Sequence, residues 1–141
     1  MQSVLKQIRP IPYIKSALSQ KPWYLILYVT SHCNQRCNMC FAWEMLNSLK
    51  KSEEWTLEEF TKIAKQFPNL YQLSLTGGEP TLRRDLAEII EIFYKHSNVR
   101  RITIPTNGFY TDRICKILIK LKYDDGQEII HDNNFEFKVV R

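Results

Sequence analysis

The stretch Cys33-Asn34-Gln35-Arg36-Cys37-Asn38-Met39-Cys40 follows directly on an apolar run, Leu25 to Val29, and carries three of the chain's four cysteines. Three thiolates on one short loop can converge on one metal centre, and thiolate ligands select zinc, copper(I) or an iron–sulfur cluster. Structural zinc sites close with four ligands, commonly as two spaced pairs, and no second pair follows here. A cubane cluster on three cysteines would leave one iron open to a further ligand, as a catalytic cluster requires.

Strand-like and helix-like segments alternate around this loop. Strands are predicted over 23–30, 70–76 and 101–105, and helices over 56–66, 85–98 and from Thr111 onward. A capping box, Thr56-Leu57-Glu58-Glu59, marks the start of the first of these helices. The alternation predicts an α/β fold with a parallel sheet and right-handed crossovers. The nearly continuous apolar run of the first strand predicts that both faces of this strand are covered. After the cysteine loop, Phe41 to Leu49 are expected to form a short helix.

A second motif, Thr76-Gly77-Gly78-Glu79-Pro80, ends the second predicted strand. Both motifs therefore fall on loops at the carboxyl ends of strands, where α/β folds bind their ligands. Together they resemble the radical S-adenosylmethionine (SAM) superfamily, whose hallmark is a C-x3-C-x2-C loop after the first strand and Gly-Gly-Glu-Pro after the second. The resemblance covers roughly Trp23 to Tyr110. The sequences of residues 75–82 and 106–108 most resemble those of peptide-modifying maturases and molybdenum-cofactor-type enzymes within this superfamily.

The resemblance implies two cofactors, a 4Fe–4S cluster and SAM, whose reductive cleavage yields a 5′-deoxyadenosyl radical that abstracts hydrogen from an unknown substrate. A ferredoxin- or flavodoxin-type reductant is implied too, and the substrate class is left between a peptide and a small molecule. No catalytic side chain is singled out. The implied cluster ligands are Cys33, Cys37 and Cys40, and the implied SAM-contacting residues are Gly77, Gly78, Glu79, Met39, Phe41 and Asn107.

The fold implied by the resemblance is a partial (β/α) barrel, of which about three βα units are present. Six such units need about 180 residues at ~30 residues each, and the chain has 141. Three parts are expected: an N-terminal helical extension over 1–22, the radical SAM core over 23–122, and a divergent or truncated tail over 123–141. Asp125-Gly126 indicates a hairpin, and 135–139 alternate as a strand does. Truncation is favoured over a divergent fourth strand.

Composition narrows the function classes. The chain is 44% hydrophobic and 12% aromatic, so it can build a core. Its longest apolar run is strand-sized, and the N-terminus lacks the apolar region of a signal peptide, so no membrane association and a cytoplasmic location are expected. The net charge of +5 comes from dispersed basic residues, which favours a solvated surface over a nucleic-acid interface.

Two alternatives to an active enzyme remain open. One is a truncated, non-catalytic fragment that keeps an iron–sulfur loop. The other is a zinc-binding interaction module, which would need His32 or Cys115 as a fourth ligand. Cys115 stands among apolar residues of a predicted helix and is expected to be a buried structural cysteine. Asn107 also fits an ordinary turn, because Asn-Gly is a common turn dipeptide.

Overall fold

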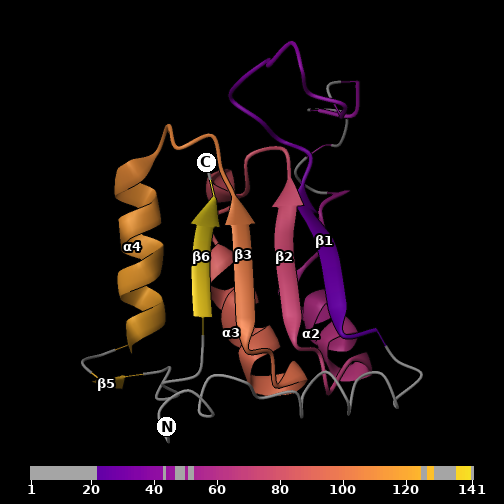
Figure 1. Cartoon of the computed structure of the whole chain (residues 1–141), viewed down its shortest axis with the longest axis vertical. Coiled ribbons are helices and arrows are strands. Elements are labelled where there is room, and N and C mark those ends of the chain that lie inside the picture. Colours follow the sequence, from indigo (N-terminus) through magenta and orange to yellow (C-terminus); the bar gives the residue numbers. More distant parts are fainter. Residues whose placement is uncertain are drawn as a thin grey trace, which may run out of the picture.

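The chain folds around a four-stranded parallel sheet (Figure 1). The computed structural model describes residues 22–42, 44–46, 50, 53–124, 127–128 and 136–140. In chain order the elements are β1 (Tyr24–Thr30), α2 (Leu57–Gln66), β2 (Gln72–Gly77), the 3-10 turn η2 (Pro80–Leu82), α3 (Leu86–Ser97), β3 (Arg101–Pro105), α4 (Thr111–Lys122), β4 (Tyr123–Asp124), β5 (Gln127–Glu128) and β6 (Glu136–Val140). The sheet order is β1-β2-β3-β6. The predicted α/β fold, consistent with a partial barrel, is confirmed.

The register of the parallel strands aligns their apolar side chains on one face of the sheet. Leu27 pairs with Leu75, and Leu73 pairs with Ile102. Helices α2, α3 and α4 pack on this face, where Phe60 of α2 and Phe93 of α3 are fully buried. Burial of one such side chain stabilises the fold by about 1.5–3 kcal/mol relative to its exposure. The core therefore lies between the sheet and one layer of helices.

Helix α2 begins with the predicted capping box. Thr56 Oγ1 accepts a hydrogen bond from Glu59 N, and the Glu59 carboxylate accepts from Thr56 N at 2.8 Å. The hydrogen bond from Thr56 N to the Glu59 carboxylate, and after it the one that Thr56 Oγ1 donates to the same carboxylate at 2.9 Å, lower the pKa of Glu59 below its ordinary value of 4.5. At the other end of the next helix, α3, Asn98 adopts the left-handed conformation that ends many helices.

Two burial predictions are wrong. Ile26 and Tyr28 of β1 are exposed, because the described helices cover only the opposite face of the sheet. Cys115 is exposed as well, whereas it was expected to be buried. Helix α4 turns its Ile117 and Leu121 side toward the core, which leaves Cys115 on the outer side.

The tail adds a fourth strand to the sheet. β6 pairs in parallel with β3 over its whole length, so the edge of β3 is covered. β4 and β5 pair antiparallel on either side of residues 125–126, in agreement with a hairpin there, although the turn itself lies outside the described residues. The predicted helical continuation after the cysteine loop is wrong for its described part, since residues 41–42 and 44–46 form turns only.

The predicted N-terminal extension, except for Pro22, lies outside the described residues. Within the described part of the chain, no helix has the length and apolarity that crossing a membrane requires.

Candidate metal and cofactor site

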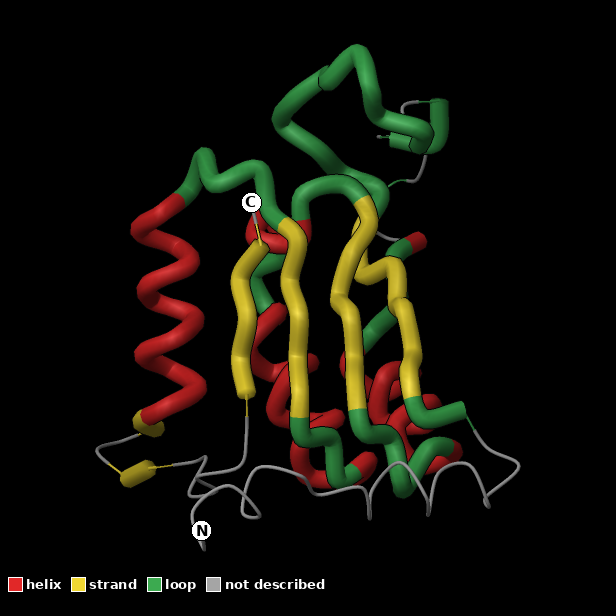
Figure 2. Tube along the Cα trace, in the orientation of Figure 1, coloured by secondary structure: helices red, strands yellow, loops and turns green. Residues whose placement is uncertain are grey.

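Three loops that follow strands meet at one edge of the sheet. The cysteine loop follows β1, the Gly-Gly-Glu-Pro loop follows β2, and the Thr106-Asn107-Gly108 loop follows β3. Because parallel strands end at the same edge, these segments lie together at the top of the sheet in Figure 2. The sheet therefore unites both sequence motifs.

The Gly-Gly segment lies against the end of β1 and the start of the cysteine loop. Gly78 N donates to Thr30 O and Glu79 N donates to His32 O, both at 2.8 Å. A Cβ at Gly77 would lie 2.2 Å from Thr30 O, and one at Gly78 would lie 2.1 Å from His32 O. Gly77 also has a φ of +129°, which side chains rarely allow. Only glycine at both positions permits this contact.

Glu79 ties the second loop to the third. Its side chain is 1% exposed. Oε1 accepts from Thr106 Oγ1 at 2.7 Å and from Thr81 Oγ1 at 2.5 Å, and Oε2 accepts from Asn107 N at 2.7 Å. A buried carboxylate needs such donors to compensate for its lost hydration. Glu79 thus has a structural part in the site, and its predicted contact with SAM stays a prediction.

Asn107 joins the third loop to the cysteine loop. Its Nδ2 donates to Asn34 Oδ1 at 2.9 Å, and its Oδ1 accepts from Phe109 N at 3.0 Å. The side-chain amide therefore holds the turn of its own loop and bridges to the residue after Cys33. The prediction of an ordinary turn at Asn-Gly is confirmed, and the predicted contact of Asn107 with SAM stays a prediction.

The cysteine loop holds the three predicted metal ligands. Cys33 and Cys40 are half-buried and Cys37 is exposed, and Cys40 N donates to Cys37 O at 3.0 Å. Among the described residues, no three His, Cys, Asp or Glu side chains are arranged to hold a metal ion. Three thiolates are nevertheless the donor type that iron–sulfur clusters take. The donor chemistry fits a cluster, and the loop must draw its thiols together to bind one.

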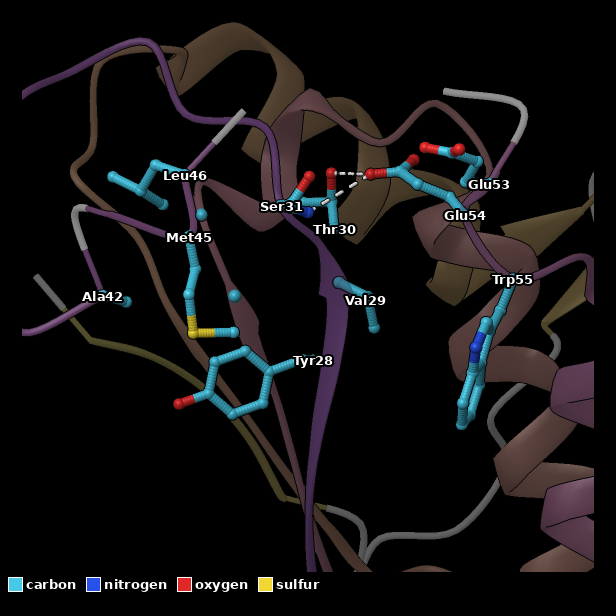
Figure 3. Close-up of a pocket in the computed structure, with 12 residues that line it drawn as sticks. Tyr28, Val29, Thr30, Ser31, Ala42, Met45, Leu46, Glu53, Glu54 and Trp55 are labelled. Atoms are coloured by element: carbon cyan, nitrogen blue, oxygen red, sulfur yellow. Dashed lines mark hydrogen bonds between the residues drawn. The ribbon is translucent and has the colours of Figure 1, made fainter. Parts of the chain in front are cut away.

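A cavity of about 240 Å³ opens between the end of β1, residues that follow the cysteine loop and the Gly-Gly segment (Figure 3). Its walls include Tyr28, Met45 and Trp55, together with both glycines. Ser31 also lines it, and the buried Ser31 Oγ has no hydrogen-bond partner among the described residues. A buried hydroxyl without a partner is costly unless a ligand or water satisfies it. The cavity therefore fits a ligand with apolar parts and a polar group near Ser31.

Met39 and Phe41, which were predicted to contact SAM, are both 89% exposed and do not line this cavity. Their contact with SAM stays a prediction.

The sequence profile of the radical SAM superfamily matches residues 27–126, which include both motifs and all three loops. The chain belongs to the radical SAM superfamily. This superfamily is a family of enzymes that bind a 4Fe–4S cluster and SAM and that generally use a reductant and a substrate.

Radical SAM relatives with curated names include three enzymes called GTP 3′,8-cyclase. The protein from Pasteurella multocida is 33% identical over 112 residues, which cover 77% of this chain and 33% of the relative. The protein from Haemophilus ducreyi is 37% identical over 92 residues, 64% of this chain and 27% of the relative. The protein from Cronobacter sakazakii is 35% identical over 100 residues, 68% and 30%. The chain thus spans about a third of the length of the curated relatives it matches.

Two residues beside the candidate site, Glu54 and Arg83, were not predicted from the sequence. The Arg83 side chain is 7% exposed and that of Glu54 is 10% exposed. Glu54 accepts hydrogen bonds from Thr30 Oγ1 and, at 3.3 Å, from Ser31 N. Arg83 directly follows the segment 77–82, and its position two residues before Asp85 was the one feature of the sequence that indicated an ion pair there. Glu54 had none, because it lies in a polar linker.

Proposed function

We propose that this chain forms the cofactor-binding part of a radical SAM enzyme. The observation that supports the proposal best is the pair of backbone hydrogen bonds from Gly78 and Glu79 to Thr30 and His32. They hold the motif loop against the residue that precedes Cys33, in a chain whose superfamily binds both cofactors. This contact supports a site in which a cluster on the cysteine loop and SAM at the Gly-Gly segment would lie next to each other.

In this proposal each residue has a separate task. Cys33, Cys37 and Cys40 would hold the 4Fe–4S cluster through their thiolates, and SAM would bind beside it. The backbone at Gly77 and Gly78 borders the methionine part of SAM. The Ser31 hydroxyl, which has no hydrogen-bond partner within the described part of the chain, hydrogen-bonds the cofactor. When bound, the cluster and SAM supply reductive cleavage of a carbon–sulfur bond and a 5′-deoxyadenosyl radical for hydrogen abstraction.

The remaining contacts position these groups and limit the access of water. Glu79 and Asn107 fix the second and third loops relative to one another through buried hydrogen bonds. Tyr28 and Trp55 supply apolar walls for the cavity. Rigid support of this kind keeps a cofactor's reactive atom at a fixed position relative to a substrate.

The relatives' name makes GTP the first substrate to test for a protein that contains this chain. A one-electron reductant of ferredoxin or flavodoxin type and a cytoplasmic location, which keeps thiols reduced, belong to the same proposal.

Electron paramagnetic resonance of the anaerobically reconstituted, dithionite-reduced chain, with and without SAM, tests the proposal. We expect a reduced 4Fe–4S signal that changes when SAM is added, because SAM takes the open iron. A cluster signal indifferent to SAM would contradict the cofactor-binding role and favour a non-catalytic iron–sulfur fragment. Zinc without sulfide in the purified chain would favour a zinc-binding module.

A further inference from the structure

The segment 29–32, which leads into Cys33, is held by polar groups on two sides. On one side lie the backbone amides of Gly78 and Glu79, which donate to Thr30 O and His32 O. On the other side lie Glu54 and Arg83, which the proposed function does not use. The contacts of these two side chains converge on the same few residues.

Glu54 and Arg83 contact this segment at four consecutive residues. Arg83 Nη1 donates to Val29 O at 2.7 Å. The Glu54 carboxylate accepts from Thr30 Oγ1 and from Ser31 N, and its Oε1 lies 4.0 Å from His32 Nε2. Backbone groups at the end of a strand otherwise bond to water, so their capture by two nearly buried side chains fixes where the chain leaves β1.

The guanidinium of Arg83 is fixed in turn by its other partners. Its Nε and Nη2 donate to the two oxygens of Asp85 at 2.8 and 3.0 Å, and Nη2 also donates to Trp55 O. Arg83 Nη1 lies 3.8 Å from Glu54 Oε2, and the guanidinium carbon lies 4.9 Å from the centre of the Phe60 ring. The planar fork of arginine permits this set of bonds, and a lysine ammonium cannot reproduce it.

Residues 77–85 therefore contact the segment 29–32 at two places. The backbone amides of Gly78 and Glu79 bind it near one end of the loop, and Arg83 binds it near the other. We propose that Glu54 and Arg83 are positioning residues that set the place of Cys33, and through it the geometry of the cluster loop. This inference rests on the proposed role of Cys33 as a cluster ligand. It predicts that loss of either side chain frees Cys33 while the core of the domain stays folded.

The thiols of the full chain, reduced and free of metal, give a readout that does not depend on the cluster. A short alkylation pulse followed by trypsin separates Cys33 from Cys37 and Cys40, because cleavage after Arg36 divides them. The exposed Cys115 is the internal reference. Bonds to charged groups contribute enough that we expect Glu54→Gln and Arg83→Lys to speed alkylation of Cys33 roughly tenfold relative to Cys115.

Two matched controls are Arg84→Lys, directly after Arg83, and Glu58→Gln, in the first turn of α2. Both residues are exposed. They should react as the wild type does. Thr30→Val keeps nearly the same shape and all charges. It removes the hydroxyl that donates to Glu54 and accepts from His32 N at 3.1 Å, and leaves the other contacts of Glu54 and Arg83 in place, so it should give a smaller acceleration. If circular dichroism finds Glu54→Gln and Arg83→Lys unfolded, Thr30→Val decides the question.

The same variants are then reconstituted with iron and sulfide, and the g-values and midpoint potential of the reduced cluster are measured. We expect the spectrum or the midpoint potential to change in folded Glu54→Gln and Arg83→Lys protein and to stay unchanged in the controls. A purely structural role of the two residues would not produce such a change in folded protein. An unchanged Cys33 alkylation rate in folded variants would overturn the inference. A wild-type chain without a SAM-responsive cluster would instead contradict the proposed function, while the alkylation result would still report on the positioning of Cys33.

Discussion

Replacement of Glu79 tests whether the buried carboxylate holds two loops of the site together. Glu79→Ala removes the acceptor for Thr106 Oγ1 and Asn107 N, which lie 2.7 Å from its two oxygens. Glu79→Gln keeps the shape but places an amide donor where at least one of these donors now points. Both variants leave buried donors without partners, and the alanine variant leaves more of them.

The magnitude follows from those donors. A buried donor deprived of its partner costs about 1–3 kcal/mol. Glu79 accepts from these two donors of the third loop and also from the amide and the hydroxyl of Thr81. The two donors of the third loop alone make the expected loss for Glu79→Ala at least about 4 kcal/mol of unfolding free energy, and the expected loss for Glu79→Gln is about 2 kcal/mol. Because small domains are stable by only about 5–15 kcal/mol, the alanine variant should be visibly destabilised.

Urea unfolding followed by far-ultraviolet circular dichroism measures these losses, with an unchanged dependence on urea as the sign of an unaltered native fold. Glu58→Gln is the matched control, since Glu58 is exposed and pairs with Lys62 on the same helix. We expect its effect to stay within about 0.5 kcal/mol. A loss below about 1 kcal/mol for Glu79→Ala, at unchanged urea dependence, would refute the structural part assigned to Glu79.

Three further predictions concern the loop, the glycines and the helix cap. Serine at any one of the three loop cysteines should abolish the reconstituted cluster, whereas Cys115→Ser should leave its iron and sulfide content unchanged; equal losses in all four variants would contradict the ligand set. Gly78→Ala should cost about 1–3 kcal/mol or more in urea unfolding, because its Cβ meets a backbone oxygen at 2.1 Å; a neutral variant would disprove the close approach. The lowered pKa of Glu59 contributes stability that is present above about pH 4.5 and lost as the pH falls through the lowered value. The stability difference between wild type and Thr56→Ala should therefore shrink below pH 4.5, and a constant difference would contradict that linkage.

Local patterns predicted the elements well. The capping box at Thr56 and the strand-like segment 101–105 can be recognised from residues close together in the sequence. The helix and the strand both form where they were expected. Gly77 and Gly78 were predicted to contact SAM, which stays a prediction, and the structure shows them against the end of β1. The partner of a glycine was not readable, because it comes from another part of the chain.

Faces and partners were predicted less well. The apolar run of β1 suggested a strand covered on both sides, yet Ile26 and Tyr28 are exposed. The same limit applies to Cys115, whose apolar neighbours did not reveal which side of α4 packs inward. An amphipathic pattern states which residues share a face, but only packing decides which face is covered.

The sequence by itself determined the chemistry of the cysteine loop, the strand–helix alternation and the edge of the sheet at which the motifs meet, since these follow from ligand type, spacing and the direction of parallel strands. Only the tertiary structure decided that the buried Glu79 carboxylate joins two loops. The same holds for the hydrogen bond between Asn107 and Asn34, 73 residues apart, and for that between Arg83 and Val29, 54 residues apart. Such contacts depend on strand order and register, which join distant segments, and local sequence preferences do not encode them.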